Sequence, residues 1–133
     1  MNRVLLPTLR YPRAWFGFGL LIASLITIAC LLPARDLPAL GLWDKLEHAI
    51  AFFVLAFWFA SVIARRDFFY LACALVAFGG GIEIAQGLMG LGREADILDL
   101  VADGVGILVG AGLAATPLGR WAQWIEHLLA PRP

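Results

Sequence analysis

The sequence predicts an all-α integral membrane protein, a four-helix bundle followed by a C-terminal amphipathic helix at the membrane interface. Of its 133 residues, 62% are hydrophobic and 15% are charged, and the mean hydropathy is +0.85. A soluble domain averages about 45–50% apolar and about 25% charged residues. Four long apolar stretches account for the excess, and their lack of alternation favours helices over barrel strands. This composition disfavours a disordered chain, a nucleic-acid-binding protein and a solvated domain.

Each apolar stretch is long enough to cross a hydrocarbon core of about 30 Å, which takes roughly 20 residues. The first is free of charge, and its length favours an uncleaved anchor over a secretory signal peptide. The third contains a single charge, Glu83, and the fourth has Asp99 and Asp103 near its beginning. We therefore predict one membrane domain over residues 1–133, with spans at about 14–32, 46–64, 68–92 and 97–118.

The tail over residues 118–129 places Trp121, Trp124, Ile125, Leu128 and Leu129 at three- and four-residue spacings. This pattern predicts an amphipathic helix that lies on the membrane surface. Lysine and arginine are concentrated at the N-terminus, between the second and third spans, and in the tail. Because basic residues favour the cytoplasmic side, we expect both termini in the cytoplasm.

Ionisable residues gather at the opposite, outward ends of the second, third and fourth spans. A charge at membrane depth costs at least about 2.5 kcal/mol on insertion scales, so such groups usually face a bundle interior or an aqueous cavity. If the helices bundle, these side chains meet at one site open to the outside. The ionisable residues are Asp44, Lys45, His48, Glu83, Arg93, Asp96, Asp99 and Asp103, and the polar Gln86 accompanies them.

Small residues recur at every fourth position of the fourth span, at Ala102, Gly106, Gly110 and Ala114. This spacing is typical of helices that pack closely in membranes, so Gly106 and Gly110 are the predicted packing residues. The aspartates of the fourth span share this face. We therefore expect them to point into the bundle.

Two chemistries fit the polar set, whose candidate catalytic residues are His48, Glu83 and Asp99. In the first, oxygen ligands from Glu83, Asp99 and Asp103, with His48 as a further candidate, hold a divalent cation such as Mg²⁺. Lys45 and the planar fork of Arg93 would then bind a lipid phosphate or diphosphate. In the second, no metal binds, and the imidazole and Glu83 act as an acid/base pair.

Structural roles compete with these chemistries at several positions. Asp44 and Asp96 are favoured N-cap residues, and Arg93 can form an ion pair with Asp96 or Asp99. Glu83, supported by Gln86, can hold helices together by hydrogen bonds, although such bonds average only about 0.6 kcal/mol in membranes. The sequence alone leaves open whether the protein is an enzyme.

These motifs resemble the VanZ-like family of small bacterial membrane proteins. The resemblance lies in Asp44-Lys-x-x-His48, Glu83-x-x-Gln86 and Arg93-x-x-Asp96-x-x-Asp99-x-x-x-Asp103-x-x-Gly106-x-x-x-Gly110. The family usually has Asn where this chain has Asp103. The resemblance implies a multi-pass protein of the bacterial cytoplasmic (inner) membrane. Through the family's founding member it also implies a link to low-level resistance to the glycopeptide teicoplanin, but it implies no defined reaction.

Three functions follow as expectations. The first is an outward-facing polar pocket that recognises or modifies the head group of a cell-envelope lipid or cell-wall precursor. The second is a non-enzymatic structural, assembly or transporter-like subunit whose polar cluster only joins helices. The third, an ion-conducting oligomer, is disfavoured because the inner halves of the spans have no continuous polar lining. The expected partner is the lipid bilayer, and no nucleic acid is expected.

Overall fold

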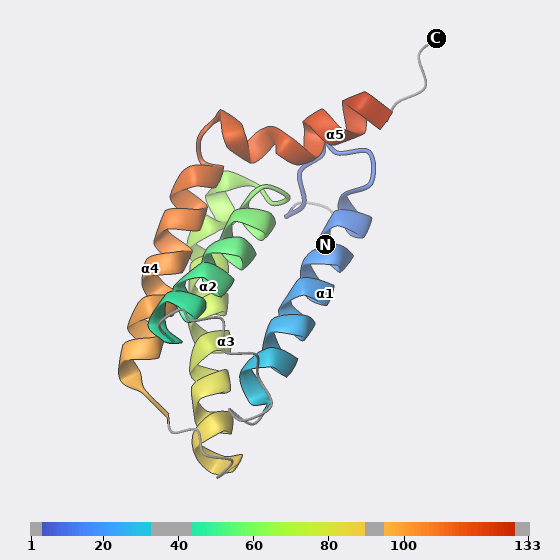
Figure 1. Cartoon of the computed structure of the whole chain (residues 1–133). Coiled ribbons are helices and arrows are strands. Elements are labelled where there is room, and N and C mark those ends of the chain that lie inside the picture. The colour runs from blue at the N-terminus through green and yellow to red at the C-terminus, as the bar shows by residue number, and fades with distance from the viewer. Residues whose placement is uncertain (1–3, 33–43, 90–94, 130–133) are drawn as a thin grey trace.

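The protein is described by a computed structural model that covers residues 4–32, 44–89 and 95–129 (Figure 1). Within these ranges the regular secondary structure is helical, apart from one isolated antiparallel bridge between Leu5 and Ile63. The prediction of an all-α chain is therefore confirmed. The α-helices are α1 (Pro12–Leu31), α2 (Asp44–Ala60), α3 (Phe68–Met89), α4 (Ile97–Ala114) and α5 (Trp121–Leu129), and the 3₁₀ turns Arg65–Asp67 and Pro117–Arg120 precede α3 and α5.

Three segments of the described chain are long and apolar enough to cross a membrane, namely Pro12–Leu31, Arg65–Met89 and Ile97–Ala114. Their large apolar side chains are widely exposed, with Leu88 at 82% and Leu108 at 73%. α2 has 17 residues, which at about 1.5 Å per residue extend about 25 Å. Helix α2 is thus shorter than the second predicted span, and a fourth crossing stays a prediction.

Helix α2 ends at Ala60, before the predicted 64, because the next residues pair with the N-terminal segment. The N–H of Leu6 donates to the carbonyl of Val62 at 2.9 Å, and the N–H of Ala64 donates to the carbonyl of Val4 at 2.9 Å. These apolar residues therefore bury themselves against another segment of the chain instead of extending the helix.

Helix α4 likewise ends at Ala114, before the predicted 118. Thr116 caps the 3₁₀ turn that follows, its hydroxyl accepting from the N–H of Leu118 at 3.2 Å. Pro117 stands at the first position of that turn, where the missing N–H costs nothing and the fixed φ suits a helical start. The turn redirects the chain from α4 into α5.

Helices α2 and α4 run in the same direction and lie side by side, whereas α1 and α3 run the opposite way (Figure 1). The contact between α2 and α4 is a close approach of backbones. A Cβ atom on Gly106 would collide with the carbonyl of Ala49, and one on Gly110 would lie 2.9 Å from the N of Phe57. Glycine at these positions permits the approach, as small residues do in membrane helix pairs.

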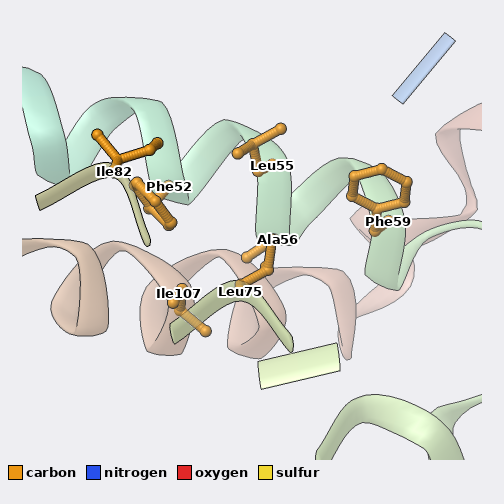
Figure 2. Close-up of a cluster of buried hydrophobic side chains, with 7 residues drawn as sticks. All are labelled: Phe52, Leu55, Ala56, Phe59, Leu75, Ile82 and Ile107. Atoms are coloured by element: carbon orange, nitrogen blue, oxygen red, sulfur yellow. The ribbon is translucent and has the colours of Figure 1, made fainter. Parts of the chain in front are cut away.

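The apolar core lies between α2, α3 and α4 (Figure 2). Helix α2 supplies most of it, and side chains from α3 and α4 complete the contact. Partly buried residues of α1, such as Phe16 and Ile22, pack against its edge. The core residues are Phe52, Leu55, Ala56, Phe59, Leu75, Ile82 and Ile107.

At one end of the bundle, α5 lies across the ends of the long helices (Figure 1). Three indole rings meet there, and we call this region the aromatic end. The ring centroid of Trp58 lies 4.7 Å from that of Trp121 and 5.9 Å from that of Trp15. The centroids of Trp15 and Trp121 lie 5.2 Å apart. Trp58 also donates from Nε1 to the carbonyl of Trp15 at 3.0 Å.

A carboxylate of α5 completes the aromatic end. Glu126 accepts from the backbone N–H of Arg10 at 2.6 Å, from that of Tyr11 at 2.9 Å, and from Nε1 of Trp15 at 2.9 Å. Tyr11 is the N-cap of α1 and makes no side-chain cap of its own. Glu126 therefore places a negative charge at the N-terminus of α1, where the helix dipole favours one.

Candidate functional site

The polar residues of α2, α3 and α4 meet at the end of these helices that lies away from α5 (Figure 1). Helices α2 and α4 begin at this end and α3 finishes there (Figure 1). Residues far apart in sequence are therefore brought together by the direction of the helices alone. We call this region the polar end and define it by Asp44, Lys45, His48, Glu83, Asp96, Asp99 and Asp103.

A buried trio occupies the centre of the polar end. Nδ1 of His48 lies 3.0 Å from Oδ1 of Asp103 and 4.0 Å from Oε1 of Glu83. The exposed fractions of the three residues are 5%, 1% and 6%. One residue comes from each of α2, α4 and α3, so the trio joins all three helices.

Lys45 forms the rim of the polar end. Its Nζ donates to Oδ2 of Asp96 at 2.7 Å and to Oδ1 of Asp99 at 3.1 Å. Asp99 is buried, whereas Lys45 and Asp96 are partly exposed. Lys45 was expected to bind a phosphate, but in the structure its ammonium group is engaged by two carboxylates.

Asp96 combines capping with the ion pair. It is the N-cap of α4, and its Oδ1 accepts from the N–H of Leu98 at 2.8 Å. The Lys45 ammonium, followed by this N–H, holds the pKa of Asp96 below its ordinary value. The backbone N–H of Asp96 donates in turn to Oε2 of Glu83 at 2.9 Å, which ties the start of α4 to α3.

Two carboxylate oxygens at the polar end are buried and have no hydrogen-bond partner among the described residues, Oε1 of Glu83 and Oδ2 of Asp103. The Asp103 oxygen faces the backbone of α3 at Gly79, where a Cβ atom would collide with it. Buried acceptors are normally satisfied, so an unpartnered pair in one cluster calls for a ligand, a proton or a cation.

One predicted member, Gln86, lies apart from this cluster. Gln86 is buried at 4%, but its Nε2 donates to the carbonyl of Cys30 at 2.9 Å. It therefore joins α3 to the last turn of α1, where helix carbonyls need partners from outside the regular helix pattern. Arg93 lies outside the described residues. The two predicted packing residues, Gly106 and Gly110, face α2 as described above.

Asp44, His48 and Asp99 form a group of potential metal ligands among the described residues. One ligand atom from each lies within 4.8 Å of the others. Of the cation ligands proposed from the sequence, this group shares His48 and Asp99. Asp44 was predicted only as a supporting residue, and the signal that could have assigned it is its i, i+4 spacing from His48 on one face of α2.

The arrangement suits His48 to proton transfer or to metal binding. With Asp103 ionised, Nδ1–H donates to its carboxylate, which fixes the tautomer and leaves Nε2 with a lone pair. A nitrogen held in this way can accept a proton or bind a metal ion. Glu83, 4.0 Å from the same ring, adds a second negative charge beside it.

The sequence was also compared with known proteins. No protein-family model, curated protein or solved structure matches this chain. The resemblance to the VanZ-like family therefore stays a prediction from the motifs.

Proposed function

We propose that this chain is a multi-pass protein of the bacterial cytoplasmic membrane whose outward-facing polar end recognises the head group of a cell-envelope lipid or lipid-linked precursor. One observation carries the proposal. Ionisable side chains of three helices converge on one site that contains unpartnered buried carboxylate oxygens. Burying such groups in an apolar bundle is costly, and a ligand would offset the cost.

The distribution of charge supports the proposed orientation. Among the described residues, the arginines lie toward the aromatic end, at Arg10, Arg13, Arg65, Arg66 and Arg120. At the polar end the basic side chain of Lys45 is surrounded by carboxylates. By the positive-inside rule the aromatic end then faces the cytoplasm and the polar end faces outward.

The residues of the proposed site become progressively more buried from its rim to its centre. Asp44 is exposed, Lys45 and Asp96 are partly exposed, and the His48, Glu83 and Asp103 trio lies beneath them. A polar head group could reach this rim while its acyl chains lie against the exposed apolar faces of the long helices. The site is rich in carboxylates, so it favours a head group that carries an amine or arrives together with a cation.

A second function is favoured by the pairing inside the cluster. Lys45 bridges α2 to α4, and Glu83 bridges α3 to the start of α4. A structural or assembly subunit would use such contacts to hold its helices together. The two functions differ in the role of the unpartnered oxygens. Head-group recognition would use them to bind a ligand, whereas a purely structural cluster does not need them.

Alanine substitutions distinguish the two functions. Asp99→Ala and Glu83→Ala, in nanodiscs of bacterial lipid extract, should lose the lipids that co-purify with the wild-type protein in native mass spectrometry. In cells, the same variants should lose any protection against teicoplanin that the wild-type protein confers. Glu126→Gln is the control, because it weakens the aromatic end and leaves the polar end intact.

Retention of the same lipids by both alanine variants would reject head-group recognition. If both variants instead lower the melting temperature in detergent and show no selective loss of lipid or of protection, the polar end is structural glue. The protein level in the membrane is measured for each variant, so that a loss of lipid is counted per folded molecule.

A further inference from the structure

The polar end presents the ligand set of a transition-metal site. A ring nitrogen of His48 and carboxylate oxygens of Asp44 and Asp99 lie within 4.8 Å of one another. Ligand atoms at about 2.1 Å from one tetrahedrally coordinated ion lie about 3.4 Å from one another. The three side chains would therefore have to move together by up to about 1.4 Å when the ion binds.

The backbone explains why these three residues meet. Asp44 and His48 are one turn apart at the start of α2, and Asp99 lies in the first turn of α4. The two helices run side by side in the same direction, so their first turns are neighbours (Figure 1). The glycine seam at Gly106 and Gly110 holds them at short range.

The contact between His48 and Asp103 is a second, independent indication. Metal-binding histidines usually donate their other ring N–H to a carboxylate, which orients the ring and raises its basicity. Oδ1 of Asp103 stands 3.0 Å from Nδ1 in this position. Nε2 is then the nitrogen left for a ligand.

A third indication is the excess of negative charge. Oε1 of Glu83 is buried without a hydrogen-bond partner among the described residues and lies 4.0 Å from Nδ1 of His48. Asp99 and Asp103 add buried carboxylates, and within the described part of the chain the nearby lysine or arginine is Lys45, whose ammonium group already bonds two acids. A divalent cation beside the imidazole would compensate this charge.

We propose that Asp44, His48 and Asp99 bind a divalent transition-metal ion such as Mn²⁺ or Zn²⁺, with Asp103 as the residue that orients His48. The imidazole ligand favours Zn²⁺ over Ca²⁺ and Mg²⁺, which prefer oxygen alone, and the two carboxylates also suit Mn²⁺. Three protein ligands leave positions open for water or for a phosphate oxygen. This inference rests on the proposed function and deepens it, because the ion would let a carboxylate-rich site bind an anionic head group.

Lys45 has a defined place in this site. Its ammonium group bonds Oδ1 of Asp99, so Oδ2 is the oxygen left for the ion. Two positive charges near one carboxylate repel each other. Lys45→Met should therefore bind the metal more tightly than the wild-type protein does, which is the opposite of what removal of a ligand does.

The test uses the full chain in nanodiscs, freed of metal with EDTA and titrated with Mn²⁺ followed by electron paramagnetic resonance, with Zn²⁺ as competitor. His48→Gln and Asp99→Asn should weaken Mn²⁺ binding at least tenfold, and Asp103→Asn should weaken it about 10- to 100-fold, as loss of a residue that orients a ligand does. Glu126→Gln, at the opposite end, should bind like the wild-type protein.

Asp44→Asn covers the case in which buried variants fail to fold, because Asp44 is exposed. It should fold normally and still bind Mn²⁺ at least tenfold more weakly. No saturable binding of Mn²⁺ or Zn²⁺ to the wild-type protein, or unchanged affinity in Asp44→Asn and Asp99→Asn, overturns the metal site.

Failure of the metal site is distinguishable from failure of head-group recognition. Lipid that remains bound to the wild-type protein in EDTA, but is lost in Asp99→Ala, rejects the metal and retains the head-group proposal. Specific metal binding without any retained lipid supports the metal site and rejects the head-group proposal.

Discussion

Glu126 at the aromatic end and Glu83 at the polar end differ in how many of their carboxylate oxygens accept hydrogen bonds. Both oxygens of Glu126 are used at the aromatic end, where three N–H groups donate to them. At the polar end, Oε2 of Glu83 has a partner, whereas Oε1 is buried without one. A carboxylate that only holds helices together can have both of its oxygens occupied by N–H donors of the protein, as Glu126 does. The contrast applies to the two carboxylates, because Nε1 of Trp121 at the aromatic end is also buried without a hydrogen-bond partner among the described residues. Glu126 uses both of its oxygens, whereas Glu83 has binding capacity left over.

Trp58→Ala should have the largest effect on stability. It removes the ring that contacts both Trp15 and Trp121, and it removes the hydrogen bond to the Trp15 carbonyl. We expect a loss of about 3 kcal/mol in the free energy of unfolding, measured by denaturant in detergent. Lipid or metal binding per folded molecule should stay unchanged. A loss of binding in the folded variant would show that the two ends are not independent.

Glu126→Gln and Glu83→Gln form a matched pair that tests the comparison directly. The first should cost about 1–2 kcal/mol, because a neutral amide cannot satisfy three donors. The second should change stability by less than about 1 kcal/mol, because an amide oxygen can still accept from Asp96 while the unpartnered charge disappears. Unfolding titrations of both variants provide the measurement. Equal losses would assign Glu83 to structural glue.

The pH dependence of stability should be a smaller effect, and Glu126 at the aromatic end should contribute to it. Burial acts to raise the pKa of Glu126, but the N–H groups of Arg10, Tyr11 and Trp15 outweigh it and lower the pKa below its ordinary value. The contribution of Glu126 is then complete above the pKa of the unfolded chain, about 4.3.

As the pH falls from there through the lower pKa of the folded state, the unfolded chain binds its proton first and stability is lost. The melting temperature of the wild-type protein should therefore decrease on acidification across this window. Glu126→Gln should reduce the slope, and an unchanged slope would contradict the role of this carboxylate.

Gln86→Ala should have the smallest effect. It removes one hydrogen bond, from Nε2 to the Cys30 carbonyl at the end of α1. Interhelical bonds of this kind average about 0.6 kcal/mol in membranes, so the free energy of unfolding should fall by about that amount. Metal and lipid binding should be unaffected. Selective loss of binding in this variant would place Gln86 in the site after all.

Local sequence patterns predict much of this architecture. Apolar length predicts the long helices, and the position of charged residues at helix starts predicts that the polar residues of α2 and α4 lie near one another. These features depend on residues close in sequence, through helix periodicity and the cost of exposing charge to lipid. The pairing of Gly106 and Gly110 with a neighbouring helix follows from the same kind of local pattern.

Other features depend on contacts between distant residues and could not be predicted. Helix α2 ends early because Val62 and Ala64 pair with residues near the start of the chain. Glu126 finds its donors more than 100 residues away. Similarly, the sequence offers several acids as partners for Lys45. The position of α2 along the axis of α4 decides that Asp96 and Asp99 are the ones within bonding distance.

Gly79 has no functional group, yet the position of Asp103 depends on it. Any larger residue there would meet Oδ2 of Asp103 and the ring of Phe52, at 3.1 Å in the latter case. Displacing Asp103 would turn the His48 imidazole that it orients. In a scan of all single substitutions, Gly79 should then tolerate change as poorly as a ligand-binding residue does, although it contacts no ligand itself. Intolerance to mutation at this end of the protein therefore extends beyond the residues that act chemically.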